Sequence, residues 1–199
     1  MHLGVFGGTF DPPHNGHLAL SLFARELLGL EKIMISVSNN PFKRERQAAD
    51  EHRKRMAELL SREINLTGTC SEVSGWELEK QQPSYTIDLL RYAHALYPLA
   101  HLTLLVGEDS YREFASWKDS RQLSALCDIV VFRRAAPEDD RSAEETLPPK
   151  GSIRFIDFAY PLSSTRIREL VSTGESITRL VPPTVNRYII EHGLYRPLP

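Results

Sequence analysis

Residues Gly7–His17 of this chain of 199 residues read GGTFDPPHNGH, and they directly follow the short apolar run His2–Phe6. The two adjacent glycines carry no Cβ, so an anion could approach the backbone closely there. The main-chain amides of Gly8, Thr9 and Phe10 would supply hydrogen-bond donors, and a helix beginning within the stretch would add the positive end of its dipole. The stretch therefore predicts a phosphate-binding turn between a strand and a helix.

Two histidines close this stretch. His14 and His17 are three residues apart in the first turn of the expected helix, so their side chains share a face. Imidazoles donate hydrogen bonds and can become charged near neutral pH, and both properties suit contact with phosphate. Taken singly, a glycine pair is ordinarily a turn, and a histidine near a helix start is ordinarily a cap or a surface residue. Their occurrence together after the first strand favours a nucleotide site.

Apolar patterns typical of strands and helices alternate along the chain. Strands are predicted at 2–6, 32–37, 101–106, 129–132 and 152–157, with weaker extended segments at 64–67 and 69–73, and helices at 15–28, 50–62, 84–97, 120–126, 164–173 and 184–192. Residues 135–150 are charged, contain proline and lack a period, which predicts a mobile surface loop. Nearly continuous apolar strands alternating with helices predict an α/β, Rossmann-like, doubly wound and mainly parallel sheet with helices on both faces, in one domain of residues 1–199.

Polar segments follow several of the predicted strands. In doubly wound folds, ligands bind at the carboxyl ends of the strands. The segments at these ends are Gly7–His17, Asn39–Lys43, Gly107–Asp109, Arg133–Arg134 and, beyond the last strand, Ser163–Arg168. Their positions predict one shared site along that edge of the sheet.

The segment Ser163–Arg168 reads SSTRIR at an expected helix start. Ser and Thr are common helix caps, so an ordinary cap is one interpretation. Arginine in a first turn is unfavourable against the helix dipole unless an anion is present to use it. Hydroxyls, free amides and guanidinium groups together favour a second phosphate-binding segment, in which Arg166 is a flanking residue.

Charge and composition exclude several classes of protein. The net charge of −2 argues against a general nucleic-acid surface. No apolar run is long enough to span a bilayer, and the first residues lack the features of a signal peptide, so we expect a cytoplasmic protein without a membrane partner. Cys70 and Cys127 lack C-x-x-C spacing, which predicts reduced structural thiols and no metal site. Homo-oligomer formation is left open.

The two histidines carry a family resemblance, since HNGH resembles the H-x-G-H signature of the nucleotidyltransferase superfamily related to class I aminoacyl-tRNA synthetases. Read in full, Gly7–His17 resembles the opening of bacterial nicotinate-mononucleotide adenylyltransferases. Further matches follow in family order over nearly the whole chain, at Pro83–Thr86, Gly107–Ser110, Trp117–Lys118, Leu162–Arg168, Tyr188–Ile189 and Gly193–Arg196. The resemblance implies the nucleotidyltransferase type of fold and transfer of the adenylyl group of ATP to nicotinate mononucleotide, which gives nicotinate-adenine dinucleotide and pyrophosphate in NAD biosynthesis.

The resemblance also implies a set of site residues. Catalysis would involve His14, His17, Lys43 and Arg168, and ATP would contact Gly8, Thr9, Phe10, His14, His17, Gly107, Asp109, Ser163, Ser164, Thr165 and Arg168. Nicotinate mononucleotide would contact Gly7, Lys43, Ser84, Tyr85, Thr86, Trp117 and Arg133. Mg²⁺ would be carried by the ATP phosphates and water, since no carboxylate cage is evident.

Several of these residues have simpler interpretations. Residues 83–86 could be only a capped helix start, Trp117 a core residue and Asp109 a helix cap. The chain departs from the family at Phe42, where an imidazole is often found, although Lys43 keeps the following basic position.

Other functions remain open at this point. A pantetheine-phosphate or nicotinamide-mononucleotide adenylyltransferase would share the first and last motifs. A nucleotide-binding regulator without turnover is disfavoured because both histidines and Arg168 are present. A tRNA-binding module is disfavoured by the charge balance.

Overall fold

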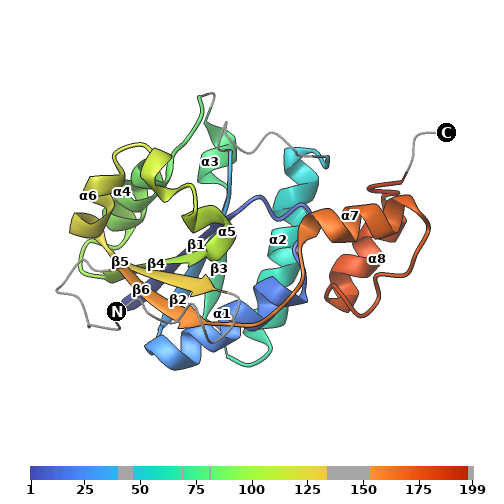
Figure 1. Ribbon diagram of the computed structural model, residues 1–199, viewed down its shortest axis with the longest axis horizontal. Coiled ribbons are helices and arrows are strands. Elements are labelled where there is room, and N and C mark those ends of the chain that lie inside the picture. The colour runs from blue at the N-terminus through green and yellow to red at the C-terminus, as the bar shows by residue number, and fades with distance from the viewer. Residues whose placement is uncertain (40–46, 69, 81, 134–152, 197–199) are drawn as a thin grey trace, which may run out of the picture.

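The centre of the computed structural model, which describes residues 1–39, 47–68, 70–80, 82–133 and 153–196, is a parallel β-sheet (Figure 1). Within these residues the sheet has six strands in the spatial order β3-β2-β1-β4-β5-β6. The strands are β1 (His2–Gly8), β2 (Lys32–Val37), β3 (Ser71–Ser74), β4 (His101–Gly107), β5 (Asp128–Arg133) and β6 (Ile153–Asp157), and each neighbouring pair is parallel. The order changes direction between β1 and β4, which confirms the predicted doubly wound sheet.

Helices cover both faces of this sheet. They are α1 (Asn15–Leu28), α2 (Asp50–Asn65), α3 (Trp76–Glu79), α4 (Thr86–Leu96), α5 (Glu108–Tyr111), α6 (Ser120–Leu126), α7 (Ser164–Ser172) and α8 (Pro183–Glu191), with a 3₁₀ turn at Phe114–Ser116. Apolar residues of α1 and α2 pack on one face of the sheet, and those of α4 and α6 pack on the other. Figure 1 shows α7 and α8 beside α2, away from the strands.

The alternation of side chains along each strand builds these two layers. In β4, Leu104 and Val106 join the core beneath α4 and α6, whereas Leu105 joins the core beneath α1 and α2. In β5, Ile129 and Val130 divide in the same way. Strands that are buried on both faces need apolar residues at successive positions, which explains the continuous apolar runs of the sequence.

A third apolar cluster holds α7 and α8 against α2. Met56 of α2, Ile167 of α7 and Val185 of α8 are fully buried within it. Two hydrogen bonds join α7, α8 and their connection to the turn after β1. The main-chain amide of Asn15 donates to the Leu180 carbonyl at 2.9 Å, and the Ser164 hydroxyl donates to the Pro12 carbonyl at 2.8 Å. The packing therefore brings the Ser163–Arg168 segment to the turn after β1, where the sequence predicted a phosphate site.

The predicted elements are largely confirmed, with one error. Residues 64–67 were expected to be extended, but α2 continues through Asn65 because Ile64 is buried with Leu60 and Ala57 at helical spacing. The short helices α3 and α5 were not predicted. The loop predicted at 135–150 lies outside the described residues, and the assignment of the chain to one domain stays a prediction. In the described part of the chain, no helix has the length and apolarity that a membrane span requires.

Candidate active site

The turn after β1 is shaped by a buried aromatic ring. A Cβ at Gly8 would lie 3.0 Å from the ring of Phe10, so only glycine leaves room for that ring. Phe10 is fully buried, has a φ of 49° and contacts Phe6 edge-on, with ring centroids 5.6 Å apart. The side chain of Phe10 therefore anchors the turn from beneath, and any contact between Phe10 and a ligand is left to its backbone.

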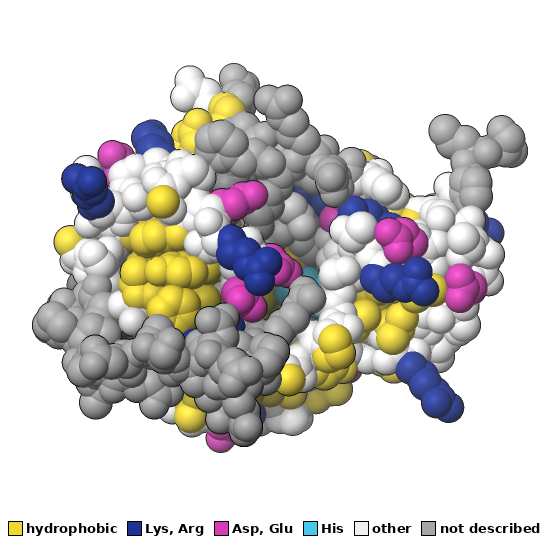
Figure 2. Space-filling model, in the orientation of Figure 1, with side chains coloured by type: hydrophobic (Ala, Val, Ile, Leu, Met, Phe, Trp, Pro, Cys, Tyr) yellow, Lys and Arg dark blue, Asp and Glu magenta, His cyan; other side chains and the backbone are white. Residues whose placement is uncertain are grey.

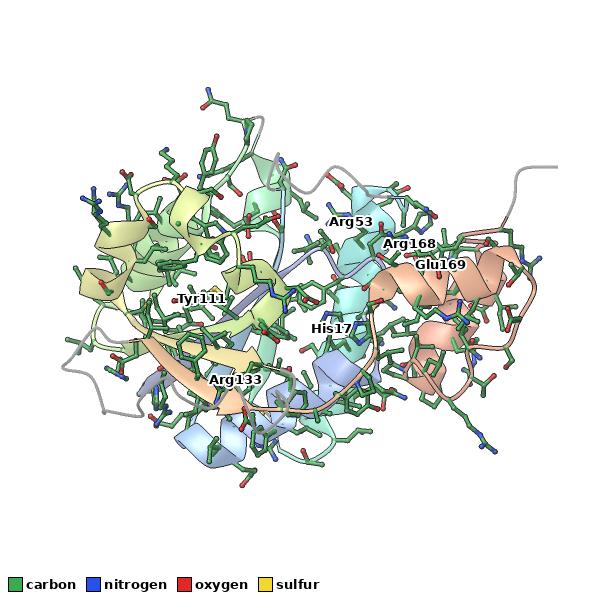
Figure 3. All side chains as sticks on the ribbon, in the orientation of Figure 1. His17, Arg53, Tyr111, Arg133, Arg168 and Glu169 are labelled. Carbon is green, nitrogen blue, oxygen red and sulfur yellow. The ribbon has the colours of Figure 1, made fainter. Side chains whose placement is uncertain are left out.

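Arg53 of α2 braces the same turn. Its fully buried guanidinium donates to the carbonyl oxygens of Thr9 at 2.8 Å and of Ser38 at 3.1 Å, and it pairs with Asp50 at 2.6 Å. The Ser38 amide in turn donates to the Gly8 carbonyl at 2.8 Å. The segments that leave β1 and β2 are thereby tied together. Figure 3 shows Arg53 on α2, close to Arg168 of α7.

The two histidines lie at the start of α1 and touch. His14 caps the helix, and its amide donates to Nδ1 of His17 at 3.1 Å. Their rings stack with centroids 3.7 Å apart, and the His17 ring also packs against Phe10 at 5.2 Å. A Cβ at Gly16 would approach His14 Nδ1 to 2.9 Å, so glycine is needed here for the His14 ring.

His14 is held in an apolar environment. Its residue is 7% exposed, and in the described part of the chain Nδ1 has no hydrogen-bond partner. Burial lowers the pKa of His14 from 6.5 to about 4, so the imidazole is neutral at neutral pH. A neutral ring of this kind can donate to a phosphate oxygen, and an approaching anion would favour its protonation.

A hollow opens beside these histidines at the carboxyl ends of β1 and β4. We call it the histidine pocket; its polar lining comprises Gly7, Gly8, Thr9, His14, His17, Gly107, Glu108, Asp109, Ser110, Ser163 and Ser164. Phe158 and Tyr160 add an aromatic wall. Figure 2 shows the hollow near the middle of this face, with a histidine and acidic side chains around it.

The start of α7 contributes to this pocket in part. Ser163 caps α7 by accepting from the Arg166 amide at 3.2 Å, and both Ser163 and Ser164 line the pocket. Thr165 and Arg168 do not. Arg168 is 8% exposed, and its guanidinium donates to the Asp11 carbonyl at 2.9 Å and to Thr165 Oγ1 at 3.3 Å. In this structure Arg168 braces the turn after β1 and does not face the pocket.

Asp11 is the centre of a buried polar cluster below the turn. Its carboxylate accepts from the main-chain amides of Gln47 at 2.7 Å and Ala48 at 3.1 Å, and from the Tyr195 hydroxyl at 2.7 Å. Burial and the neighbouring carboxylate raise the pKa of Tyr195. The cluster joins the turn after β1 to Tyr195. Asp11 and Tyr195 both lie in matched sequence motifs, but the motifs did not predict that the two side chains meet.

A second hollow adjoins the first on the other side of β1 and β4. We call it the tryptophan pocket; its lining includes Gly7, Ser38, Glu77, Ser84, Thr86, Leu89, Gly107, Ser110, Glu113 and Trp117. Gly7, Gly107 and Ser110 line both pockets, so the two adjoin there. Ser84, Thr86 and Trp117 are thus brought to one place.

The remaining predicted contacts differ in position. Tyr85 is the residue before α4 and lies beneath the Lys118 ammonium, which is 4.8 Å from the ring centroid, rather than in the pocket lining. Arg133 lines neither pocket; its Nε donates to Asp157 Oδ1 at 2.6 Å, and Figure 3 shows it well separated from His17. Lys43 lies outside the described residues. Glu77, which lines the tryptophan pocket, was not singled out from the sequence.

Metal-ligating side chains do not cluster in the described part of the chain. No group of three or more His, Cys, Asp and Glu side chains there is arranged to hold a metal ion. Cys70 and Cys127 are buried free thiols in the two opposite layers of the core.

Comparison with known proteins adds the family. The cytidylyltransferase-like family model matches residues 5–170. A protein of Pelodictyon phaeoclathratiforme named "Probable nicotinate-nucleotide adenylyltransferase" is 62% identical over 98% of this chain and 92% of its own length. A protein of Chlorobium limicola with the same name is 56% identical over 98% of this chain and 99% of its own.

A solved structure matches the fold at lower identity. The Plasmodium falciparum nicotinic acid mononucleotide adenylyltransferase complexed with NaAD superposes with a TM-score of 0.73 at 19% identity, covering 98% of this chain and 97% of that one. The sequence matches and this shared fold agree with the geometry of the two pockets. The chain belongs to the cytidylyltransferase-like family and, within it, to the nicotinate-nucleotide adenylyltransferases.

Proposed function

We propose that this chain transfers the adenylyl group of ATP to nicotinate mononucleotide, releasing pyrophosphate and forming nicotinate-adenine dinucleotide. The observation that carries the proposal is that the two pockets adjoin at Gly7, Gly107 and Ser110. Two ligands that meet at a reacting phosphate need adjoining sites with open backbone between them. A Cβ at Gly107 would meet no atom within 4 Å, so this wall leaves space for the reacting groups.

ATP would occupy the histidine pocket. The main-chain amides of the turn after β1 and the amino end of α1 would supply donors for its phosphates. Ser163 and Ser164 supply hydroxyls from the opposite wall. Asp109, at the end of β4, would accept from a ribose hydroxyl or the adenine amino group.

The mononucleotide would occupy the tryptophan pocket. The indole of Trp117 offers an aromatic face for the pyridine ring. The amino end of α4, which begins at Thr86, offers amides for the nicotinate carboxylate. Arg133 would have to leave Asp157 to reach this ligand, and Lys43 remains a proposed phosphate contact.

The reaction itself is a displacement at phosphorus. A phosphate oxygen of nicotinate mononucleotide attacks the α-phosphorus of ATP, the bond from that phosphorus to the bridging oxygen breaks, and pyrophosphate leaves. No nucleophile from the protein is needed, so catalysis consists of positioning and charge stabilisation. His14 and His17 would donate hydrogen bonds to the α-phosphate as negative charge builds up.

Further cationic support would come from groups beyond the histidines. Glu108 and Asp109 are the only carboxylates in the described pocket lining, and no third metal-ligating side chain is placed there to complete a metal site with them, so we propose that Mg²⁺ arrives on the ATP phosphates and keeps its water ligands. When bound, Mg²⁺ would neutralise charge on the phosphates. Arg168 is not part of the pocket lining, and two of its five N–H donors are engaged by Asp11 and Thr165, so contact with the triphosphate would require its guanidinium to move toward the pocket.

Acceptor choice tests the proposal. Pyrophosphate release should be measured with ATP and, in separate reactions, nicotinate mononucleotide, nicotinamide mononucleotide and phosphopantetheine. We expect the highest kcat/KM with nicotinate mononucleotide. Equal or higher kcat/KM with phosphopantetheine would refute the proposed acceptor, and no release with any acceptor would favour a regulator without turnover.

A further inference from the structure

A buried carboxylate lies in the wall of the tryptophan pocket. Glu77, on the short helix α3, is 4% exposed and lines the pocket. Its Oε1 accepts from the Ser36 hydroxyl at 2.7 Å. Its Oε2 accepts from the Ser84 hydroxyl at 2.5 Å and from the main-chain amide of Asn39 at 3.4 Å. Two segments, residues 36–39 at the end of β2 and Ser84 before α4, thus converge on one side chain.

Each of these bonds has a defined direction. An ionised carboxylate only accepts, so both serine hydroxyls must donate to it. A hydroxyl has one proton, and the fully buried Ser84 uses that proton in its hydrogen bond to Glu77. The Ser84 side chain therefore cannot donate to a ligand carboxylate while this bond exists. Its contribution is to fix the chain just before α4, where the amides of that helix begin.

The third bond, from the main-chain amide of Asn39, fixes the segment after β2 in the same way. Asn39 is two residues beyond the end of β2 and directly precedes the segment that carries Lys43. Glu77 therefore connects two stretches that we assign to the mononucleotide, the start of α4 and the exit from β2. All three of these bonds are made on the side of the tryptophan pocket, away from the histidines at the start of α1.

We propose that Glu77 is a positioning residue for the mononucleotide half of the site, acting through Ser84 and Asn39; this inference rests on the proposed function. Misplacement of the α4 amides would weaken mononucleotide binding, because hydrogen bonds to a carboxylate depend steeply on distance and angle. ATP binding depends on the walls of the histidine pocket, so we expect KM for ATP to change little. The position of the acceptor oxygens matters here more than the negative charge.

Two substitutions at Glu77 separate geometry from charge. Glu77→Asp keeps the charge but withdraws the carboxylate by about 1.5 Å, one C–C bond. Glu77→Gln keeps the length and one oxygen, which can serve Ser84 and Asn39 while the new amide donates to Ser36 Oγ. We expect Glu77→Asp to raise KM for nicotinate mononucleotide about tenfold, the equivalent of one or two buried hydrogen bonds, and Glu77→Gln to raise it less.

The experiment measures KM for both substrates and kcat in each variant, together with thermal unfolding. Glu63→Asp is the matched control, because Glu63 accepts from Thr184 at 2.7 Å between α2 and α8, remote from both pockets. Ser84→Ala deletes the central hydroxyl without touching Glu77 and carries the test if Glu77→Asp does not fold. It should raise KM for the mononucleotide several-fold with KM for ATP within about twofold.

The outcomes separate the inference from the proposed function. Wild-type protein that forms no dinucleotide would refute the function. With active wild-type protein, a larger effect of Glu77→Gln than of Glu77→Asp would show that charge dominates and overturn the positioning role. Equal increases in both KM values, or unchanged KM values in Ser84→Ala and Glu77→Asp, would overturn it as well.

Discussion

Replacing His17 should separate a structural role from a chemical one. In His17→Ala the His14 amide loses its acceptor, a bond of 3.1 Å that helps to cap α1, and the stacked contact of the two rings disappears. A helix cap contributes about 1 kcal/mol, and loss of a partly buried ring adds a similar amount at most. For a chain of this size, about 1–2 kcal/mol corresponds to a fall in Tm of roughly 2–8 °C.

The chemical effect should be larger. If His17 donates to the α-phosphate as charge develops, its loss should lower kcat by roughly 10²-fold, the scale seen when one oxyanion donor is removed. His17→Gln isolates this effect, because a glutamine oxygen at the third helical position can accept from the cap amide as His17 does. We expect His17→Gln to regain most of the lost Tm and almost none of the lost kcat.

The assay is pyrophosphate release at saturating ATP and nicotinate mononucleotide, with Tm measured on the same preparations. His14→Ala should also lower kcat strongly. The reasoning is refuted if His17→Gln turns over at a rate near that of the wild type, since His17 would then serve only as a cap.

Other substitutions test the remaining walls of the site. Trp117→Ala should raise KM for the mononucleotide far more than KM for ATP, and an equal effect on both would mean that Trp117 is only a core residue. Gly107→Ala, at a φ of −75° with open space around the new Cβ, should leave Tm unchanged or slightly higher yet lower kcat/KM by about tenfold or more; full activity would show that ligands do not approach this backbone. Because burial depresses the pKa of His14 from 6.5 to about 4, the free energy of unfolding is full above pH 6.5 and falls as the pH drops toward 4. Urea unfolding over that range should show the wild type losing up to about 3 kcal/mol more than His14→Gln, and parallel curves would mean that His14 is solvated. Nicotinate mononucleotide should be preferred over its amide by about tenfold or more, because amides at the start of α4 would face an uncharged group that presents its own NH₂; equal kcat/KM would overturn the assignment of residues 84–86.

The sequence was informative where a periodic pattern or a motif was long. The bounds of α1, β2 and α6 are as predicted, since each has a clear period and a turn at its end. The helices α3 and α5 have four residues each, too few for a period to be visible. The end of α2 was missed because Ile64 and Thr67 are β-branched and favour extended structure, whereas burial decided the conformation of Ile64.

For the candidate site, too, the sequence predicted some features and could not predict others. The motifs located both pockets, because carboxyl ends of parallel strands meet at one edge. They could not show which polar side chains face a ligand and which turn inward. Arg168 was expected at the phosphates, yet it donates to the backbone of Asp11, and Glu77 carries no motif that reveals its three partners. Such choices depend on tertiary contacts between segments far apart in the chain.

The fate of the α-phosphorus of ATP tests the account most directly. The protein should be incubated with nicotinate mononucleotide, Mg²⁺ and ATP labelled at the α-phosphorus, and in a parallel reaction with ATP labelled at the γ-phosphorus. We predict that the α-label passes into nicotinate-adenine dinucleotide and the γ-label into pyrophosphate, in equal amounts. An α-label that stays in ATP, or that appears as free AMP without dinucleotide, would contradict adenylyl transfer to the mononucleotide.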